Sequence, residues 1–174
     1  ESFLPSGSWQ GYPGWVKSSD LTAAEPAATA AVVRVRQALL HRGADILILS
    51  VGTRLSRVSE SAGTTFVRLL DGSLAEIATD ALYAPPDQPT AASRAEIIRT
   101  AELFLGTSYY WGGRSGVQPD PKIGVDCSGL VSLAYRIHGR DMPRDSHEQK
   151  LHSRAVLRRE LESGDLVFLT DGES

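Results

Sequence analysis

The single cysteine of this 174-residue chain, Cys127, lies where a helix is expected to begin. Asp126 directly before it is a favourable N-cap residue, and Gly139 marks the expected helix end. Between them, apolar residues recur at helical spacing: Leu130, Val131, Ala134 and Ile137. The sulfur would then stand in the first helical turn, where free backbone N–H groups and the helix dipole favour the thiolate. The pattern predicts a nucleophilic cysteine.

The alternative is that Cys127 is a small buried apolar residue, which is the commoner role of a free cysteine. Small polar neighbours and the position at a helix start favour the nucleophile instead. A nucleophilic thiol also needs a base that accepts its proton. His138 lies eleven residues further along the expected helix, about 16 Å along its axis, and is too distant. His41 is expected in a polar turn, and nothing in the spacing of His147 or His152 requires either to approach Cys127.

Short runs of β-branched and alternating residues dominate the first half of the chain and are punctuated by Gly and Asp. We expect strands at residues 32–36, 46–49, 53–59 and 65–70. Asp71 and Gly72 then form a tight hairpin turn. Closely spaced strands of this kind predict a five- or six-stranded barrel over residues 28–84. A weak internal repeat aligns residues 14–21 with residues 75–82, so residues 1–27 are expected to end a first copy of the same barrel.

The second half of the chain is expected to combine helices and a strand. Residues 85–92 are rich in proline and form the linker, and residues 93–174 form the second domain. Within it, residues 97–105 carry a helical apolar stripe, the cysteine helix follows, and residues 166–169 form a strand. The predicted fold class is therefore α+β, with a small barrel before a helix-and-strand domain.

Four motifs in residues 93–174 carry a resemblance to a known family. The segments read GTSYYWGG (106–113), DCSGLV (126–131), PRDSHEQ (143–149) and GDLVF (164–168). In this order they resemble the NlpC/P60 cysteine peptidases, bacterial enzymes that cut cell-wall peptides, and the resemblance implies a papain-like domain. The preceding barrel resembles a bacterial SH3 (SH3b) domain, a common neighbour of NlpC/P60 domains.

The resemblance implies roles for several residues besides Cys127, the catalytic nucleophile. By motif position, Tyr109 or Tyr110 supplies a hydroxyl near the nucleophile, and Tyr109 fits the spacing to Trp111 better. Trp111 is implied to line the cleft. Asp126 and Ser128 are implied to grip the D-Glu carboxylate region of the substrate. The remaining implied substrate-binding residues hold the free amine of an N-terminal L-Ala: Tyr12, Asp145 and Ser146. For Asp145, a role as a solvated turn residue or helix cap is as strong an alternative.

The resemblance also places the catalytic histidine and its orienting residue after the GDLVF strand. Residues 170–174 read TDGES and contain no histidine. We therefore expect these 174 residues to be a fragment of a longer polypeptide. Alone, the fragment is expected to be inactive.

Composition excludes several other classes of protein. A formal charge of −3 without a basic cluster gives no electrostatic basis for nucleic-acid binding. No apolar run approaches the roughly 20 residues that span a bilayer. Neither a metal site nor a cofactor is expected. The sequence does not decide between the cytoplasm and the cell envelope, and it does not fix the oligomeric state.

The leading hypothesis is a cysteine peptidase that hydrolyses the γ-D-Glu to diamino acid bond of cell-wall (murein) peptides, with preference for a free N-terminal L-Ala. One alternative is a non-catalytic wall-peptide-binding module with an inactive peptidase domain. Another is acyl or amide transfer on the same thiol, which would need an apolar acyl site.

Overall fold

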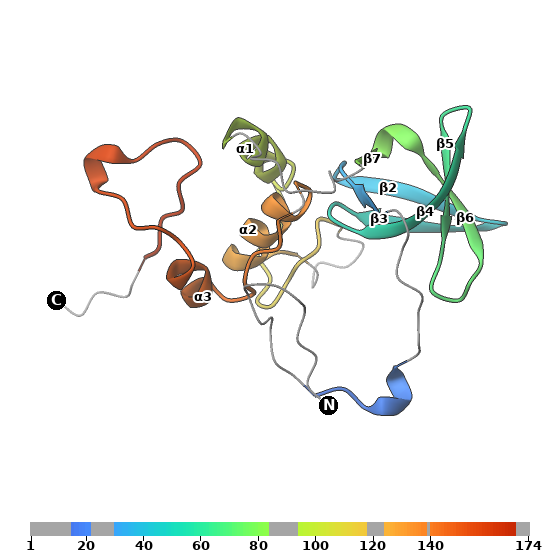
Figure 1. The fold of residues 1–174 in the computed structure, drawn as a ribbon, viewed down its shortest axis with the longest axis horizontal. Helices are drawn as coiled ribbons and strands as arrows, with labels where there is room; N and C mark the ends of the chain where they lie inside the picture. Colours follow the sequence, from blue (N-terminus) through green and yellow to red (C-terminus); the bar gives the residue numbers. More distant parts are fainter. Residues whose placement is uncertain (1–14, 22–29, 84–93, 118–123, 139, 170–174) are drawn as a thin grey trace.

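The computed structural model describes residues 15–21, 30–83, 94–117, 124–138 and 140–169. A sheet occupies the first half of the chain and helices the second (Figure 1). The strands are β1 (Ala30–Val33), β2 (Gln37–Arg42), β3 (Asp45–Ser50), β4 (Arg54–Ser61), β5 (Thr64–Arg68), β6 (Leu74–Ala78) and β7 (Leu82–Tyr83). The helices are α1 (Arg94–Glu102), α2 (Cys127–Arg136) and α3 (Ser146–Leu151), with one-turn segments η1 (Ser18–Asp20), η2 (Thr79–Ala81) and η3 (Arg158–Glu160).

The seven strands form one sheet with the order β3-β2-β6-β5-β4-β1-β7, and every neighbouring pair is antiparallel. The four predicted strands overlap β1, β3, β4 and β5, but β1 ends at Val33 and β5 at Arg68, so the predictions for residues 34–36 and 69–70 are wrong. The predicted turn at Asp71 and Gly72 joins β5 to β6; Gly72 has φ +82°, and the Asp71 carboxylate accepts hydrogen bonds from the Ser73 N–H and hydroxyl.

The expected closed barrel is not what the described strands form. Closure requires the two edge strands to pair, but β3 pairs only with β2 and β7 only with β1, so the sheet is open. β7 has only two residues, both of which pair with β1. The proposed boundaries at residues 27, 84 and 92 stay predictions, since 22–29 and 84–93 lie outside the described residues.

One face of the sheet encloses an apolar core. Alternate residues of β2 and β6 are buried, as the two-residue period of a strand requires. The core contains Val33, Ala38, Leu40, Val67, Ala75, Ile77 and Ala81. This packing holds β1, β2, β5 and β6 around a common interior.

A second apolar core joins the sheet to the helices. Its buried members come from β1, the β3–β4 turn, the turn after α1, the residue before the α2 N-cap, α2 and the α2 C-cap: Val32, Val51, Phe104, Val125, Leu133 and Ile137. Gly52, in the β3–β4 turn, has φ +82°, and a Cβ added there would lie 2.8 Å from the Leu133 Cδ2 atom. The sheet therefore packs directly against the helix that begins with Cys127.

Polar contacts strengthen the same junction. The Gly116 N–H donates to the Ser50 hydroxyl at 2.8 Å, and Arg36 donates to the Leu105 carbonyl at 3.1 Å. The Arg54–Asp141 ion pair, at 2.8 Å, links β4 to the segment after α2. The sheet is thus positioned to support the loops that surround Cys127.

The predicted strand at residues 166–169 is wrong for the part of the chain that the structure describes. These residues have no regular secondary structure, and Val167 and Leu169 are exposed. A strand needs a neighbour for its backbone groups, and no described segment pairs with this one. None of the described helices is both long and apolar enough to cross a bilayer.

Candidate active site

Cys127 is the first residue of α2, and it is exposed. Asp126 is the N-cap residue, and its carboxylate accepts a hydrogen bond from the Gly129 N–H at 2.6 Å. The alternative of a buried apolar cysteine is therefore wrong, and the predicted helix start is confirmed. The thiol has access to solvent at the end of a helix where a negative charge is favoured.

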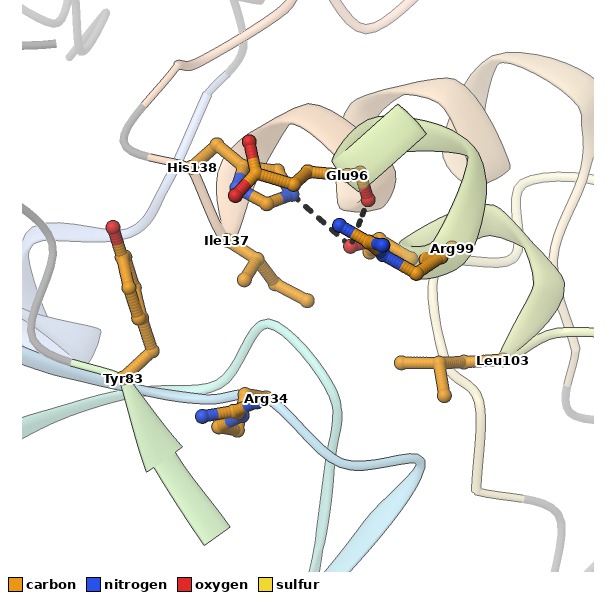
Figure 2. Close-up of a pocket in the computed structure, with 8 residues that line it drawn as sticks. Arg34, Tyr83, Glu96, Arg99, Leu103, Ile137 and His138 are labelled. Atoms are coloured by element: carbon orange, nitrogen blue, oxygen red, sulfur yellow. Dashed lines mark hydrogen bonds between the residues drawn. The ribbon is translucent and has the colours of Figure 1, made fainter. Parts of the chain in front are cut away.

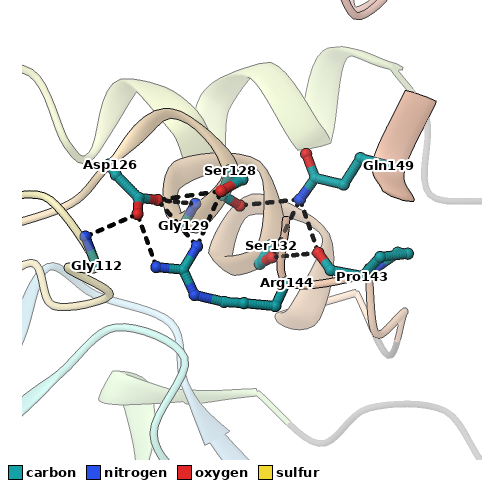
Figure 3. Close-up of polar contacts among 8 residues, drawn as sticks. All are labelled: Gly112, Asp126, Ser128, Gly129, Ser132, Pro143, Arg144 and Gln149. Atoms are coloured by element: carbon teal, nitrogen blue, oxygen red, sulfur yellow. Dashed lines mark hydrogen bonds and ion pairs between the residues drawn. The ribbon is translucent and has the colours of Figure 1, made fainter. Parts of the chain in front are cut away.

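The Asp126 carboxylate also binds a guanidinium in a forked ion pair (Figure 3). Arg144 donates to both carboxylate oxygens, at 2.7 Å and 3.2 Å, and to the Ser128 hydroxyl at 2.9 Å. The side chains of Arg144 and Asp126 are only 15% and 9% exposed. A fork of this kind fixes both distance and orientation. Arg144 therefore holds the residues on both sides of Cys127 in place.

Burial raises the pKa of Asp126, but hydrogen bonds to its charged form outweigh this effect. The donors are the Arg144 guanidinium and the N–H groups of Gly129 and Gly112, and together with the charge of Arg144 they hold the Asp126 pKa below its usual value. Asp126 is consequently a carboxylate that already has protein partners on both oxygens. Its direct contact with substrate, implied by the family resemblance, stays a prediction.

The aromatic loop is fastened to the backbone just before Cys127. The Tyr110 N–H donates to the Val125 carbonyl at 3.1 Å, and the Asp126 N–H donates to the Gly113 carbonyl at 3.1 Å. A Cβ added at Gly113 would lie 2.3 Å from the Gly124 carbonyl oxygen. Glycine is thus required here for a close approach between two stretches of the protein's own backbone.

The aromatic side chains of this loop are exposed rather than packed in a core. Tyr109 is 64% exposed and Trp111 is 84% exposed, and Tyr110 is also on the surface. They extend from a loop whose backbone is fixed to the start of α2 by the contacts just described. The structure therefore brings the predicted Tyr109 and Trp111 to the same region as Cys127, as an exposed aromatic surface.

Gln149 of α3 supports the other side of the helix start. Its side-chain amide is 1% exposed and donates to the carbonyls of Ser128 at 3.0 Å and Pro143 at 2.9 Å, with the Ser132 hydroxyl at 3.3 Å (Figure 3). The contacts tie α3 and the segment before it to the first turns of α2. Ser128 is itself buried, and its hydroxyl donates to Asp126 at 3.2 Å.

Arg144 and Gln149 were not predicted as site residues, although both lie in the PRDSHEQ motif. The available signal was chemical. When a helix-capping Asp beside a nucleophile is buried, its carboxylate needs a cationic partner. Arginine suits this role because its guanidinium can make a forked contact with a carboxylate. Which arginine supplies it depends on the fold of residues 137–144, and no local pattern specifies that.

The remaining predicted residues have different positions. Asp145 is the N-cap residue of α3 without a side-chain capping bond, and Ser146 is the exposed first residue of that helix. They are the two residues after Arg144 and so lie near the site. Tyr12 lies outside the described residues, so its role stays a prediction.

The described histidines make other contacts. His138 follows the far end of α2 and shares a hydrogen bond with Thr100, at 3.1 Å, while His152 bonds the Glu148 carbonyl at 2.8 Å. His41 lies on β2, and His147 lies on α3. Within the described ranges, no group of three or more His, Cys, Asp or Glu residues is arranged to hold a metal ion.

Known proteins resemble the chain in sequence and in structure. Residues 106–174 match the family model of the NlpC/P60 family. A γ-D-glutamyl-L-lysine dipeptidyl-peptidase of Bacillus cereus is 32% identical over an alignment of 174 positions. The alignment covers 91% of this chain and 49% of the relative. The protein of the same name from Bacillus subtilis is 32% identical over 163 residues, with coverages of 91% and 52%.

A solved structure shares the arrangement of the chain. The crystal structure of an NlpC/P60 family protein from Bacillus cereus superimposes with a TM-score of 0.75 at 29% identity, over 92% of this chain and 55% of that one. The chain spans about half the length of the curated relatives it matches. The region that matches the NlpC/P60 family model, residues 106–174, contains Cys127 and its supporting network.

Proposed function

We propose that the protein containing this chain is a cysteine peptidase that hydrolyses the bond between γ-D-Glu and the diamino acid in bacterial cell-wall peptides. The observation that carries the proposal is the exposed thiol of Cys127 at the start of α2, with a largely buried polar network between the residues on either side of it. The names of the relatives support both the proposed scissile bond and cell-wall peptides as the substrate class. Two are γ-D-glutamyl-L-lysine dipeptidyl-peptidases, and another is a bifunctional muramidase/DL-endopeptidase.

In the proposed reaction, the Cys127 thiolate attacks the side-chain carbonyl carbon of D-Glu. Backbone N–H groups in the first turn of α2 stabilise the oxyanion. The C–N bond then breaks, the diamino acid leaves with a proton on its amine, and a thioester remains on the sulfur. Water hydrolyses the thioester, which releases the dipeptide acid and restores the thiol. We expect a histidine other than His138 to move these protons, since His138 follows the opposite end of α2.

The proposed substrate lies between the aromatic loop and the segment before α3. Tyr109 and Trp111 give it an exposed aromatic surface beside Cys127. The amine of an N-terminal L-Ala would meet Asp145, because an ammonium that leaves water needs an anionic partner. Ser146 and Tyr12 are proposed to complete that end of the site, with the sheet as an SH3b-type unit that limits the length of the substrate.

The test uses the protein that contains this chain and the tripeptide L-Ala-γ-D-Glu-L-Lys, with release of L-Ala-D-Glu followed by mass spectrometry. Cys127→Ala should abolish release while leaving the thermal unfolding transition in place. Leu70→Ala is a matched control, because this residue is 93% exposed on the turn after β5. Turnover by the Cys127→Ala protein near that of the control would refute the thiol mechanism. Peptide binding without release by the unmodified protein would favour the non-catalytic binding module instead.

A second substrate tests the proposed end of the cleft. N-acetylation of the L-Ala removes the charge and adds bulk at the amine site. We expect turnover to fall at least about tenfold, equivalent to roughly 1.4 kcal/mol of transition-state binding. Equal cleavage of the free and acetylated peptides would indicate an open groove and an endopeptidase.

A further inference from the structure

A pocket of about 310 Å³ lies at the junction of the sheet and the helices. It is lined by Arg34, Tyr83, Glu96, Arg99, Thr100, Leu103, Ile137 and His138. Figure 2 shows these side chains around a shared space, with Arg34 and Tyr83 on the sheet side and Arg99 and Leu103 on the side of α1. None of them belongs to the network around Cys127, which lies at the opposite end of α2.

The ionised side chains of the lining favour a negatively charged ligand. Arg34 and Arg99 bring two guanidinium groups, and Glu96 brings one carboxylate. Among the residues that the structure describes, neither Arg34 nor Arg99 takes part in an ion pair. The backbone of Arg34 is fixed, since its N–H donates to the Ala81 carbonyl at 2.9 Å. Two guanidinium groups in the lining of one pocket suit an anionic ligand, because arginine binds oxyanions through paired N–H donors.

His138 is held in a defined orientation inside this pocket. The Thr100 hydroxyl donates its only proton to the Glu96 carbonyl at 3.1 Å, so it must accept the hydrogen bond from His138 Nε2 at 3.1 Å. The imidazole also meets the Tyr83 ring edge-on, with centroids 6.4 Å apart and an angle of 61° between the planes. Thr100 is buried, so the ring is anchored from the protein interior rather than from the surface.

The rest of the lining is apolar. Beside the two arginines, the lining has an apolar surface formed by Leu103, Ile137 and the ring of Tyr83. The volume lies at the lower end of the range for small-molecule sites, about 300–1,000 Å³. We propose that this pocket binds a small organic carboxylate, with the carboxylate between Arg34 and Arg99 and the hydrocarbon part against Leu103 and Ile137. An inorganic oxyanion would match the charge but leave the apolar wall without a partner.

Such a ligand would contact both halves of the chain at once. Arg34 and Tyr83 come from the sheet, whereas Arg99 and Leu103 come from α1 and its following turn. A ligand that binds only the packed arrangement stabilises that arrangement. Binding should therefore raise the unfolding temperature as well as perturb the pocket.

The test is a titration of the isotope-labelled protein with butanoate, followed through backbone amide NMR signals and thermal unfolding. Saturable shifts are expected at residues 34, 99–103 and 137–138, together with a higher unfolding temperature. Butanamide has the same shape without the charge and should bind at least about tenfold more weakly, as should the Arg34→Gln/Arg99→Gln protein with butanoate. Arg158→Gln, which removes an exposed arginine of η3, should leave butanoate affinity unchanged.

Three results would overturn the proposal. One is the absence of saturable shifts at the pocket residues. Another is equal affinity for butanoate and butanamide, or for butanoate in the double variant and the unmodified protein. The third is that inorganic phosphate binds as tightly as butanoate, which would assign the pocket to an oxyanion without an apolar part.

Discussion

Arg144 is expected to contribute more to stability than any exposed arginine of the chain. Its guanidinium makes a forked ion pair with Asp126 and a further hydrogen bond to Ser128, all at an almost buried position. Arg144→Ala would leave the Asp126 carboxylate in place without its cation. The stability lost in Arg144→Ala therefore reflects the cost of a buried charge without a partner, which is larger than the small contribution of a surface ion pair.

The magnitude follows from burial. Breaking a buried pair by removing one partner costs about 3–5 kcal/mol. Because 15% of Arg144 and 9% of Asp126 remain exposed, and Gly129 and Gly112 still donate to Asp126, the lower end applies. We expect a loss of about 3 kcal/mol in the free energy of unfolding. For a chain of this length, each kcal/mol lowers the unfolding temperature by about 2–4 °C, so a loss of about 3 kcal/mol lowers it by about 6–12 °C.

The assay is urea and thermal unfolding at neutral pH, followed by circular dichroism. Arg54→Ala is the matched control, since it removes an arginine from an ion pair with Asp141 in which the side chains are 41% and 54% exposed. That control should cost less than about 1 kcal/mol. Asp126→Asn alone and combined with Arg144→Ala completes a double-mutant cycle, whose coupling energy isolates the pair. If Arg144→Ala were no more destabilising than Arg54→Ala, the reasoning from the buried fork would be refuted.

Two further predictions concern the same region. The pKa of Asp126 is lowered in the folded protein, so its ionised form contributes stability that is present above the unfolded pKa of about 3.9 and lost as the pH falls through the lower folded value. Unfolding midpoints of the unmodified protein should therefore fall more steeply below about pH 4 than those of Asp126→Asn, and parallel curves would contradict this. Gly52→Ala should cost about 2–3 kcal/mol, because it combines positive φ with a Cβ 2.8 Å from Leu133. The control Gly43→Ala has positive φ but open space, so it should cost about 1 kcal/mol, and equal losses would exclude the steric contribution.

Local features of the sequence predicted the parts of the structure that depend on local rules. The N-cap role of Asp126 and the helix start at Cys127 follow from side-chain chemistry and helical spacing within a few residues. The turn at Asp71 and Gly72 follows from the positive φ that glycine adopts readily. Each of these features needs no information about distant parts of the chain.

Features that depend on distant partners were not predicted. β2 is formed by Gln37–Arg42, whose Ala and Leu residues do not favour a strand, yet pairing with β3 and β6 places it inside the sheet. Residues 166–169 have the composition of a strand but no described neighbour that pairs with them. The Arg144–Asp126 contact crosses 18 positions of sequence and depends on how the chain returns after α2.

The apolar cluster shared by the sheet and the helices also limits how the chain can be recombined. Phe104, Leu133 and Ile137 are kept from water partly by Val32 and Val51 of the sheet. A truncation that begins at α1 would leave these side chains facing solvent, and we expect it to aggregate. Replacing the sheet with another small β unit would require a surface that fits the same helix face. The shared packing therefore requires the sheet and the helices to be inherited together. Neither half can be exchanged alone unless the contact between them is rebuilt.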